Sequence, residues 1–233
     1  MKIIAAIPAR YDASRFPGKL LADLNGKPVI QHTYEKVHQS GLFDRVIIVT
    51  DSDEIASVVT GFGGDVVRSQ KEHDCGSDRI AEAVVDIDVD IVINVQGDEP
   101  FIRPEGLSSL IQVFKSDKNK DVDLASLMIP ITEEINNPNV VKVITDLSNR
   151  ALYFSRSAIP HQRIQENHAT VYKHVGVYAF RKNALIDFYE HDITPLEESE
   201  KIEAIRYLEM GKTIQMVETQ FECVGIDTAE DLE

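Results

Sequence analysis

Short apolar runs alternate with amphipathic segments through the first half of the chain. Four of the runs are rich in β-branched residues and almost continuously apolar, which is typical of parallel strands buried on both faces of a sheet. They span 2–7, 46–50, 65–68 and 91–95. Four further segments place their apolar residues at helical spacing, over 29–39, 53–62, 77–85 and 105–115. This order predicts a doubly wound, mostly parallel, Rossmann-like α/β sheet.

The regular alternation ends near residue 123. Strand-like runs follow without helices placed regularly between them, at 124–129, 140–144, 151–154 and 174–180. They predict a mixed-sheet excursion over 123–180 that covers the site or makes a dimer contact, within a single domain spanning 1–233. Thr194 to Glu197 has the pattern of a capping box with proline at the first helical position. One helix is therefore expected from 194 to about 209, ending at Gly211.

The chain is acidic, with 24 Lys and Arg against 39 Asp and Glu and a net charge of −15. Nucleic-acid binding, which needs a basic face, is disfavoured. No apolar run has the length of a membrane span or a signal peptide, so we expect a cytoplasmic protein. Cys75 and Cys223 lack metal or redox spacing and are expected to be reduced thiols. Any anionic ligand must then be held by a local cluster of cations.

Such a cluster follows the first expected strand. Arg10, Arg15 and Lys19 stand in a loop with one acidic residue, Asp12. Ligands of an open parallel sheet bind outside the carboxyl ends of the strands, and guanidinium and ammonium groups suit phosphate oxygens. The loop matches neither the Walker A pattern nor the GxGxxG pattern. It predicts a triphosphate site of another kind, the alternative being a solvated basic turn.

Two aspartates stand after apolar runs that end at the same edge of the expected sheet. Asp98 follows the run at 91–95, and Asp227 follows 224–226. Mg²⁺ is commonly bound by one or two carboxylates together with substrate phosphates and water. Turns and helix caps also favour aspartate, so the spacing alone leaves both interpretations open.

The stretch IPARYDASRFPGKLL resembles the signature of sugar-activating cytidylyltransferases, in particular the branch that activates 3-deoxy-manno-octulosonate (Kdo). Other similar segments follow in order: NGKP at 25–28, VTD at 49–51, CGSDR at 75–79, NVQGDEP at 94–100, NPNVVK at 137–142, ALYFSR at 151–156, KHVGVY at 173–178 and DTAEDL at 227–232. The family transfers CMP from CTP to the anomeric hydroxyl of a sugar acid and releases pyrophosphate. The resemblance implies this activity for lipopolysaccharide assembly, with Mg²⁺ as cofactor, and a homodimer.

The resemblance also implies roles for individual residues. For CTP it implies Pro8, Ala9, Arg10, Ser14, Arg15, Lys19 and Arg79. For catalysis it implies Lys19, Arg15 and Asp98, and for the metal Asp98 and Asp227. For the 2-keto-3-deoxy sugar acid it implies Gln96, Arg156, His174, Tyr178 and Glu203. Structural alternatives remain: His174 and Tyr178 lie on one face of a strand, and Arg156 fits an ordinary surface ion pair.

Glu198 departs from the family pattern, which often has histidine at this point. On one continuous helix it would share the apolar face with Ile202 and Ile205. The interpretation that we develop is that Glu198 pairs with an amino group on the tail of 8-amino-3,8-dideoxy-Kdo. A buried carboxylate would then give a preference of about tenfold to a hundredfold over Kdo. The alternative is that Glu198 only complements the helix N-terminus.

Two other functions stay open. A CMP-sialic acid synthetase uses a similar early loop, although the segments QGDEP, NPNVVK and ALYFSR fit the Kdo branch better. From another class, the chain could be a nucleotide-binding regulator that has lost its chemistry. The joint presence of Lys19, Asp98 and Asp227 argues against that loss.

Overall fold

The structure is a computed structural model, and it describes residues 1–11, 16–71, 73, 75–163, 169–221, 225–226 and 228–232. The chain divides into two compact units. The first comprises Met1–Ser108, Ala179–Tyr189 and Cys223–Glu233. The second comprises Ser109–Tyr178 and Glu190–Glu222.

The first unit is built on parallel strands in the order β6-β1-β4-β5. Their bounds are β1 Ile3–Ala9, β4 Arg45–Thr50, β5 Val66–Arg68 and β6 Ile91–Asn94. Every residue of β1 and β6 is buried, as the continuously apolar runs predict. The parallel part of the predicted sheet is therefore confirmed.

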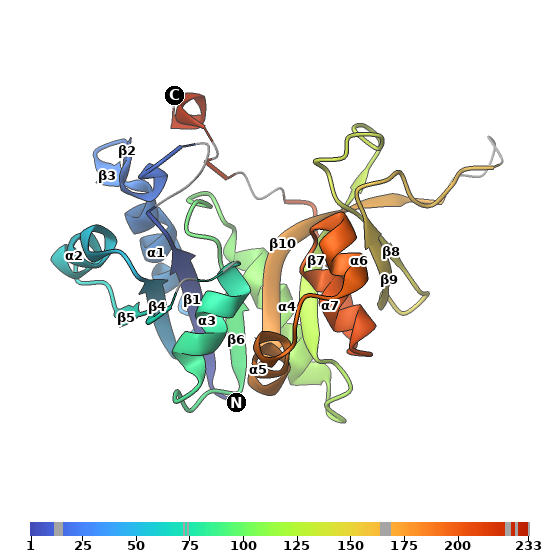
Figure 1. The fold of residues 1–233 in the computed structure, drawn as a ribbon, viewed down its shortest axis with the longest axis horizontal. Coiled ribbons are helices and arrows are strands. Elements are labelled where there is room, and N and C mark those ends of the chain that lie inside the picture. The colour runs from blue at the N-terminus through green and yellow to red at the C-terminus, as the bar shows by residue number, and fades with distance from the viewer. Residues whose placement is uncertain are drawn as a thin grey trace. The chain divides into compact units, whose positions relative to one another are not determined.

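Helices cover the sheet of the first unit on both faces. Helix α3 packs against β1, β4 and β6, whereas α1 packs against β1 and β4 from the opposite side (Figure 1). The helices within this unit are α1 Val29–Gln39, α2 Asp53–Gly61 and α3 Gly76–Val84, whereas α4 Pro104–Ser116 and α5 Lys182–Glu190 each begin in the first unit and end in the second. The smaller elements are η1 Lys19–Leu21, β2 Asp23–Leu24, β3 Lys27–Pro28 and η2 Ala229–Leu232. The four helices predicted for the first half are confirmed, while α5 was not predicted.

The strand order reverses at β1. From β1 the chain proceeds to β4 and β5 on one side, and it then returns to place β6 on the other side. Open α/β sheets bind ligands outside the carboxyl ends of their strands at such a reversal. The backbone N–H of Val95 donates to the carbonyl of Ala6, so the segments that leave β1 and β6 start side by side. Residues 8–10 and 96–98 therefore meet at this edge.

The second unit contains a mixed sheet. Strand β7 lies between β11 and β10 and is parallel to β11, while β8 pairs antiparallel with both β10 and β9. The bounds are β7 Leu124–Ile131, β8 Lys142–Thr145, β9 Ala151–Ser155, β10 Val171–Arg181 and β11 Ile214–Glu218. The mixed sheet confirms the prediction for this half, although β11 was not predicted. The buried start of β7 gives it an interior role within the unit.

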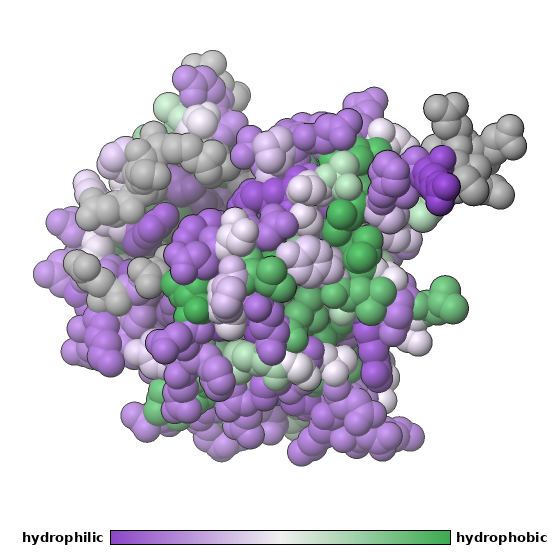
Figure 2. All heavy atoms as spheres, turned by 45° about the vertical axis from the view of Figure 1, so that its right-hand side comes forward, coloured by the Kyte–Doolittle hydropathy of each residue, from purple (hydrophilic) through white to green (hydrophobic). Residues whose placement is uncertain are grey.

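The surface of the second unit exposes several large apolar side chains. Leu147, in the turn between β8 and β9, is fully exposed, and Leu152 on β9 is more than half exposed. Ile193 and Leu196, which come shortly after α5 in the chain, are also exposed. Figure 2 shows apolar residues grouped among hydrophilic ones on one face of the molecule.

Among the helices of the described residues, none combines the length and hydrophobicity needed to cross a membrane.

The single helix predicted from 194 to 209 is wrong. Helix α6 Pro195–Glu200 ends at Lys201, whose φ of 52° lies in the left-handed region, and α7 Ala204–Glu209 begins after it. A buried ion pair joins the two helices: Arg206 donates to the Glu197 carboxylate from Nε at 2.6 Å and Nη2 at 2.7 Å. The bend turns Glu198 away from the apolar face, and its side chain is 69% exposed beside Lys201.

Glu197→Gln should destabilise the protein by about 3–5 kcal/mol, because it leaves the Arg206 guanidinium buried without a counter-charge. The free energy of unfolding in urea, followed by far-UV circular dichroism, measures the loss. Glu198→Gln is the matched control on the next residue, and it should change the free energy by less than about 0.5 kcal/mol. Equal losses in the two variants would contradict the structural role of the pair.

Candidate functional site

A lysine and an aspartate meet where the segments leaving β1 and β6 lie together. The Lys19 ammonium contacts Asp98 Oδ2 and donates to the carbonyl of Ile226 at 3.1 Å. The Lys19 and Asp98 side chains are 14% and 26% exposed, so the pair is held at a partly buried edge. The backbone N–H of Ile226 donates to the Asp98 carbonyl at 2.8 Å, which attaches the C-terminal segment to the same place.

Backbone geometry sets the position of Lys19. Gly18 has a φ of +71°, in the left-handed region that favours glycine, and its N–H donates to the carbonyl of Tyr11 at 2.9 Å. This bond closes the loop after β1 and starts the short helix η1 at Lys19. Arg10 is exposed at the other end of the loop. The predicted residues Ser14, Arg15 and Asp227 lie outside the described residues.

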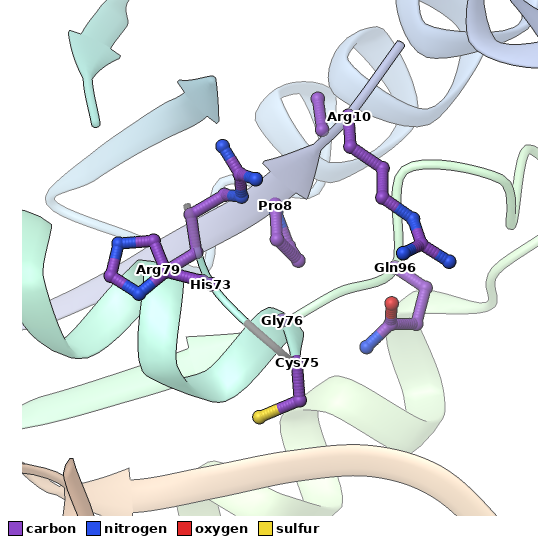
Figure 3. Close-up of a pocket in the computed structure, with 8 residues that line it drawn as sticks. Pro8, Arg10, His73, Cys75, Gly76, Arg79 and Gln96 are labelled. Carbon is purple, nitrogen blue, oxygen red and sulfur yellow. The ribbon is translucent and has the colours of Figure 1, made fainter. Parts of the chain in front are cut away.

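A small cavity of about 140 Å³ lies beside this edge. Its walls come from the end of β1, the start of α3 and the residue after Val95. They comprise Pro8, Ala9, Arg10, His73, Cys75, Gly76, Arg79 and Gln96. Figure 3 shows His73 and Arg79 on one side of Pro8, with Arg10 and Gln96 on the other. A wider cavity of about 800 Å³ adjoins it and shares Arg10, His73 and Arg79.

Close backbone approach shapes the small cavity. A Cβ atom placed on Gly76 would lie 3.0 Å from the Pro8 ring and 3.7 Å from the Gln96 amide nitrogen. Glycine therefore allows α3 to begin directly against the end of β1. Gln96 Nε2 in turn donates to Asn94 Oδ1 at 3.2 Å, which orients its amide from the end of β6.

Arg79 is buried and already paired. Its Nη1 lies 2.8 Å from Asp51 Oδ1, its Nη2 donates to Oδ2 at 3.1 Å, and the side chain is 6% exposed. Burial acts to raise the pKa of Asp51, but the hydrogen bonds and charge of Arg79 outweigh it and hold that pKa below its usual value. Because Asp51 compensates its charge, Arg79 suits the less charged base or ribose better than the triphosphate.

His73, which the sequence interpretation did not single out, completes this wall, and Glu82 behind it contacts the ring. His73 Nε2 lies 2.8 Å from the Glu82 carboxylate, and the His73 side chain is 3% exposed. The His73 ring also contacts the ring of Tyr189 on α5, with 6.0 Å between centroids. The CGSDR motif at 75–79 follows His73 closely, but nothing in the sequence indicates that His73 contacts Glu82, which lies about one helical turn after Arg79.

In the second unit His174 is buried within β10. Its Nε2 lies 2.9 Å from Ser126 Oγ on β7, and its ring packs edge-on against Phe154 and beside Tyr178. Ser126 Oγ also reaches the carbonyls of Val175 and Val177, at 3.1 and 2.9 Å. The single hydroxyl proton goes to a carbonyl, so Ser126 accepts a bond from the Nε2–H of His174. Burial lowers the pKa of His174 to about 4, and the ring is neutral at pH 7.

The Arg156 guanidinium is engaged with the backbone of the second unit. Nε donates to the carbonyl of Glu200 at 2.7 Å, and Nη1 donates to that of Pro138 at 3.0 Å. The Glu200 carboxylate accepts bonds from Ser155 Oγ and from the Arg156 backbone N–H. Arg156 thus connects the end of β9 to the junction of α6 and α7. Glu203 lies at the start of α7 and is half-buried.

A cytidylyltransferase family model matches residues 4–214. 3-Deoxy-manno-octulosonate cytidylyltransferases from Christiangramia forsetii and Flavobacterium johnsoniae are 58% and 57% identical, covering 100% of this chain and 94% and 96% of theirs. The chain belongs to the 3-deoxy-manno-octulosonate cytidylyltransferase family. It is a nucleotidyltransferase, as the sequence predicts.

Solved structures agree with this membership. A structure of CMP:2-keto-3-deoxy-manno-octonic acid synthetase complexed with CTP has a TM-score of 0.94 and 38% identity, covering 100% of this chain and 95% of that chain. A 4-diphosphocytidyl-2C-methyl-D-erythritol synthase from Anaerococcus prevotii has a TM-score of 0.65 at 18% identity, covering 99% and 95%. The second likeness concerns the fold alone.

The structure places most of the residues predicted for the nucleotide together in the first unit. Pro8, Ala9, Arg10 and Arg79 line one cavity, and Gln96, predicted for the sugar, lies with them. Lys19 and Asp98, both predicted for catalysis, are in contact. In the second unit, His174 and Tyr178 form one cluster. Ser126, which holds His174, was missed because a serine within a buried strand gives no sequence signal.

His174 should make the stability of the protein depend on pH between about 6.5 and 4. In the unfolded chain His174 binds a proton near pH 6.5, whereas in the folded chain burial lowers its pKa to about 4. Stability is therefore fully present above pH 6.5 and falls by about 3 kcal/mol as the pH drops to 4. Urea unfolding at intervals from pH 7 to pH 4 measures the slope.

His174→Phe should flatten that part of the profile, because phenylalanine binds no proton. His161→Phe is the control at an exposed histidine, and it should keep the slope of the unmodified protein. A profile that is equally steep with His174→Phe would contradict the buried neutral state of His174.

Proposed function

We propose that this enzyme transfers CMP from CTP to the anomeric hydroxyl of Kdo or a close relative. The anomeric oxygen attacks the α-phosphorus, the bond between the α-phosphorus and the bridging oxygen breaks, and pyrophosphate leaves. The observation that carries the proposal is the contact of Lys19 with Asp98 beside the Arg10–Arg79 cavity, in a chain 58% identical to a named Kdo cytidylyltransferase. By the family's pathway, the product would serve lipopolysaccharide assembly in the cytoplasm.

Positioning and charge compensation supply most of the proposed catalysis. Phosphoryl-type transfer asks little covalent chemistry of a protein. Lys19 and Arg15 would compensate negative charge on the α-phosphate and on pyrophosphate, with Arg10 and Ser14 holding the triphosphate. Arg79 would meet the base or ribose, which its pairing with Asp51 supports.

The sugar acid would be met by the remaining predicted residues. His174, neutral with Nε2–H on Ser126, would accept a sugar hydroxyl at Nδ1. Tyr178, Gln96 and Glu203 would bond other hydroxyls. Arg156 would combine its backbone contacts with a bond to the substrate carboxylate from its remaining N–H donors.

The donor groups fit a magnesium ion bound together with substrate. Among the described residues no group of three or more His, Cys, Asp or Glu side chains gathers as a metal cage. Asp98 offers one partly exposed carboxylate, and Mg²⁺ favours one or two carboxylates with phosphate and water oxygens. Asp98 and Asp227 would hold the ion, which would supply charge compensation to the phosphates.

We also propose that the enzyme is a homodimer. The exposed Leu147 and Leu152 on the β8–β9 hairpin support this, because a second copy of the chain could remove these large apolar side chains from water. Strand β7 belongs to the 123–180 excursion that we expected to cover the site or make a dimer contact, and its buried start contributes to the interior of its own unit.

Pyrophosphate release from CTP tests the proposed reaction directly. Kdo, 8-amino-3,8-dideoxy-Kdo and a sialic acid are compared as acceptors at the same Mg²⁺ concentration. Turnover with the two Kdo forms and a rate at least about a hundredfold lower with sialic acid are expected, because the acceptor pocket is matched to one hydroxyl pattern. Faster release with sialic acid would support the rival synthetase. Release with none of the three would support the regulator.

The amino-sugar arm of this panel tests the role of Glu198. We keep the proposal that its carboxylate favours the amino form, but with a smaller effect than a buried charge would give. The side chain is 69% exposed, and exposed pairs contribute only about 0–1 kcal/mol. The preference in kcat/KM should therefore stay within about fivefold, and Glu198→Gln should abolish it. Equal kcat/KM values for the two sugars would assign Glu198 to helix capping.

Asp98→Asn should lower kcat on the order of a hundredfold while leaving CTP affinity within a few-fold. The amide keeps the shape of the side chain but removes the charge that faces Lys19 and the metal. Steady-state rates across a Mg²⁺ titration, with CTP binding measured separately, distinguish the two effects. An unchanged kcat at saturating Mg²⁺ would remove Asp98 from the metal site.

A further inference from the structure

Glu82 connects the segment after β5 to helix α3. Its Oε2 atom accepts bonds from Ser69 Oγ at 2.9 Å, from the Gln70 backbone N–H at 3.1 Å and from His73 Nε2 at 2.8 Å. One carboxylate thus collects three donors from five consecutive positions of the chain. The Glu82 side chain is 17% exposed, so these bonds are partly shielded from water.

The protonation of this group follows from its surroundings. Burial acts to raise the pKa of Glu82, but the bonds from His73 and Ser69 outweigh it and keep that pKa below its usual value. Glu82 is therefore a carboxylate at neutral pH and can only accept hydrogen bonds. His73 Nε2 must carry the hydrogen that lies between the two side chains. In the neutral imidazole, Nδ1 is then an acceptor.

The position of the His73 ring gives that acceptor a use. The ring lines both cavities beside Arg79, and Tyr189 packs against it. Among the described residues Nδ1 has no hydrogen-bond partner. Arg79 is already engaged by Asp51, so this wall would otherwise present mainly donors to a ligand.

We propose that Glu82 is a positioning residue that fixes His73 as the Nε2–H tautomer, and that His73 Nδ1 accepts a bond from an N–H or O–H donor of the bound nucleotide. The donor is either the exocyclic amine of the base or a ribose hydroxyl. The proposal rests on the proposed function only for the identity of the nucleotide. The proposal adds His73 as a residue that selects among nucleotides and Glu82 as the residue that orients His73.

Equilibrium binding without the sugar acid tests the contact. Calorimetric titration compares CTP with UTP, which lacks the exocyclic amine, and with 2′-deoxy-CTP and 3′-deoxy-CTP, which each lack one hydroxyl. In His73→Phe, which keeps a ring against Tyr189, the preference for CTP over one of these analogues should shrink about three- to tenfold. The analogue affected identifies the donor.

Glu82→Leu is the second variant, and it removes the acceptor that orients His73 without removing the imidazole. Leucine accepts no hydrogen bond, so the Nε2–H tautomer loses the partner that selects it. The same preference should shrink as in His73→Phe. ¹⁵N chemical shifts of labelled histidine should report Nε2–H in the unmodified protein and a mixture of both tautomers in Glu82→Leu.

Glu35→Leu is the matched control. Glu35 also accepts bonds from two side chains, Lys27 and Gln31, but it lies on α1 away from the cavity. It should leave every nucleotide preference and the His73 tautomer unchanged. Preferences that are the same in His73→Phe as in the unmodified protein, or an Nδ1–H tautomer before mutation, would overturn this proposal. Normal CTP binding without turnover of any sugar acid would contradict the proposed function alone.

Discussion

The placement of β1 between β4 and β6 is the constraint on which the rest of the site depends. Parallel pairing on both sides buries every residue of β1, so its chemistry begins only where the strand ends. Because the strand order reverses here, the segments after β1 and β6 emerge together without a helix crossing between them. Lys19 and Asp98 come from parts of the chain 79 residues apart, yet the sheet brings them into contact.

Carboxylates hold the cationic and aromatic groups of the site in place. Asp98 holds Lys19, Asp51 holds Arg79 and Glu82 holds His73. An acidic chain with a net charge of −15 can bind a triphosphate only where its cations are locally concentrated. Pairing them keeps partly buried charges compensated, as in the contact of Lys19 with Asp98 and the ion pair of Arg79 with Asp51.

The sequence predicted the parallel half of the fold well, because continuous burial on both faces leaves a strong pattern. The helix bounds 29–39 coincide with those of α1. It failed where tertiary contacts override local preference. The pattern from 194 to 209 reads as one helix, but the ion pair of Glu197 with Arg206 stabilises a bend at Lys201. Strand β11 was missed because only Ile214 and Met216 of its five residues are buried.

The candidate site, like the fold, could be predicted only in part. Cationic residues of the loop could be predicted because their charge is unusual against the acidic background. Residues that orient other side chains of the site could not be predicted, since a glutamate on an amphipathic helix, such as Glu82 beside His73, has the same pattern as a solvent-facing acid. Its role depends on which donors the fold brings within 3 Å, and sequence spacing does not encode those distances. Ser126 is a similar case in the second unit, because its hydroxyl determines the tautomer of His174. In both units the tautomer of a histidine therefore depends on a neighbour that the sequence does not reveal, and the geometry of that neighbour decides which ring nitrogen remains an acceptor.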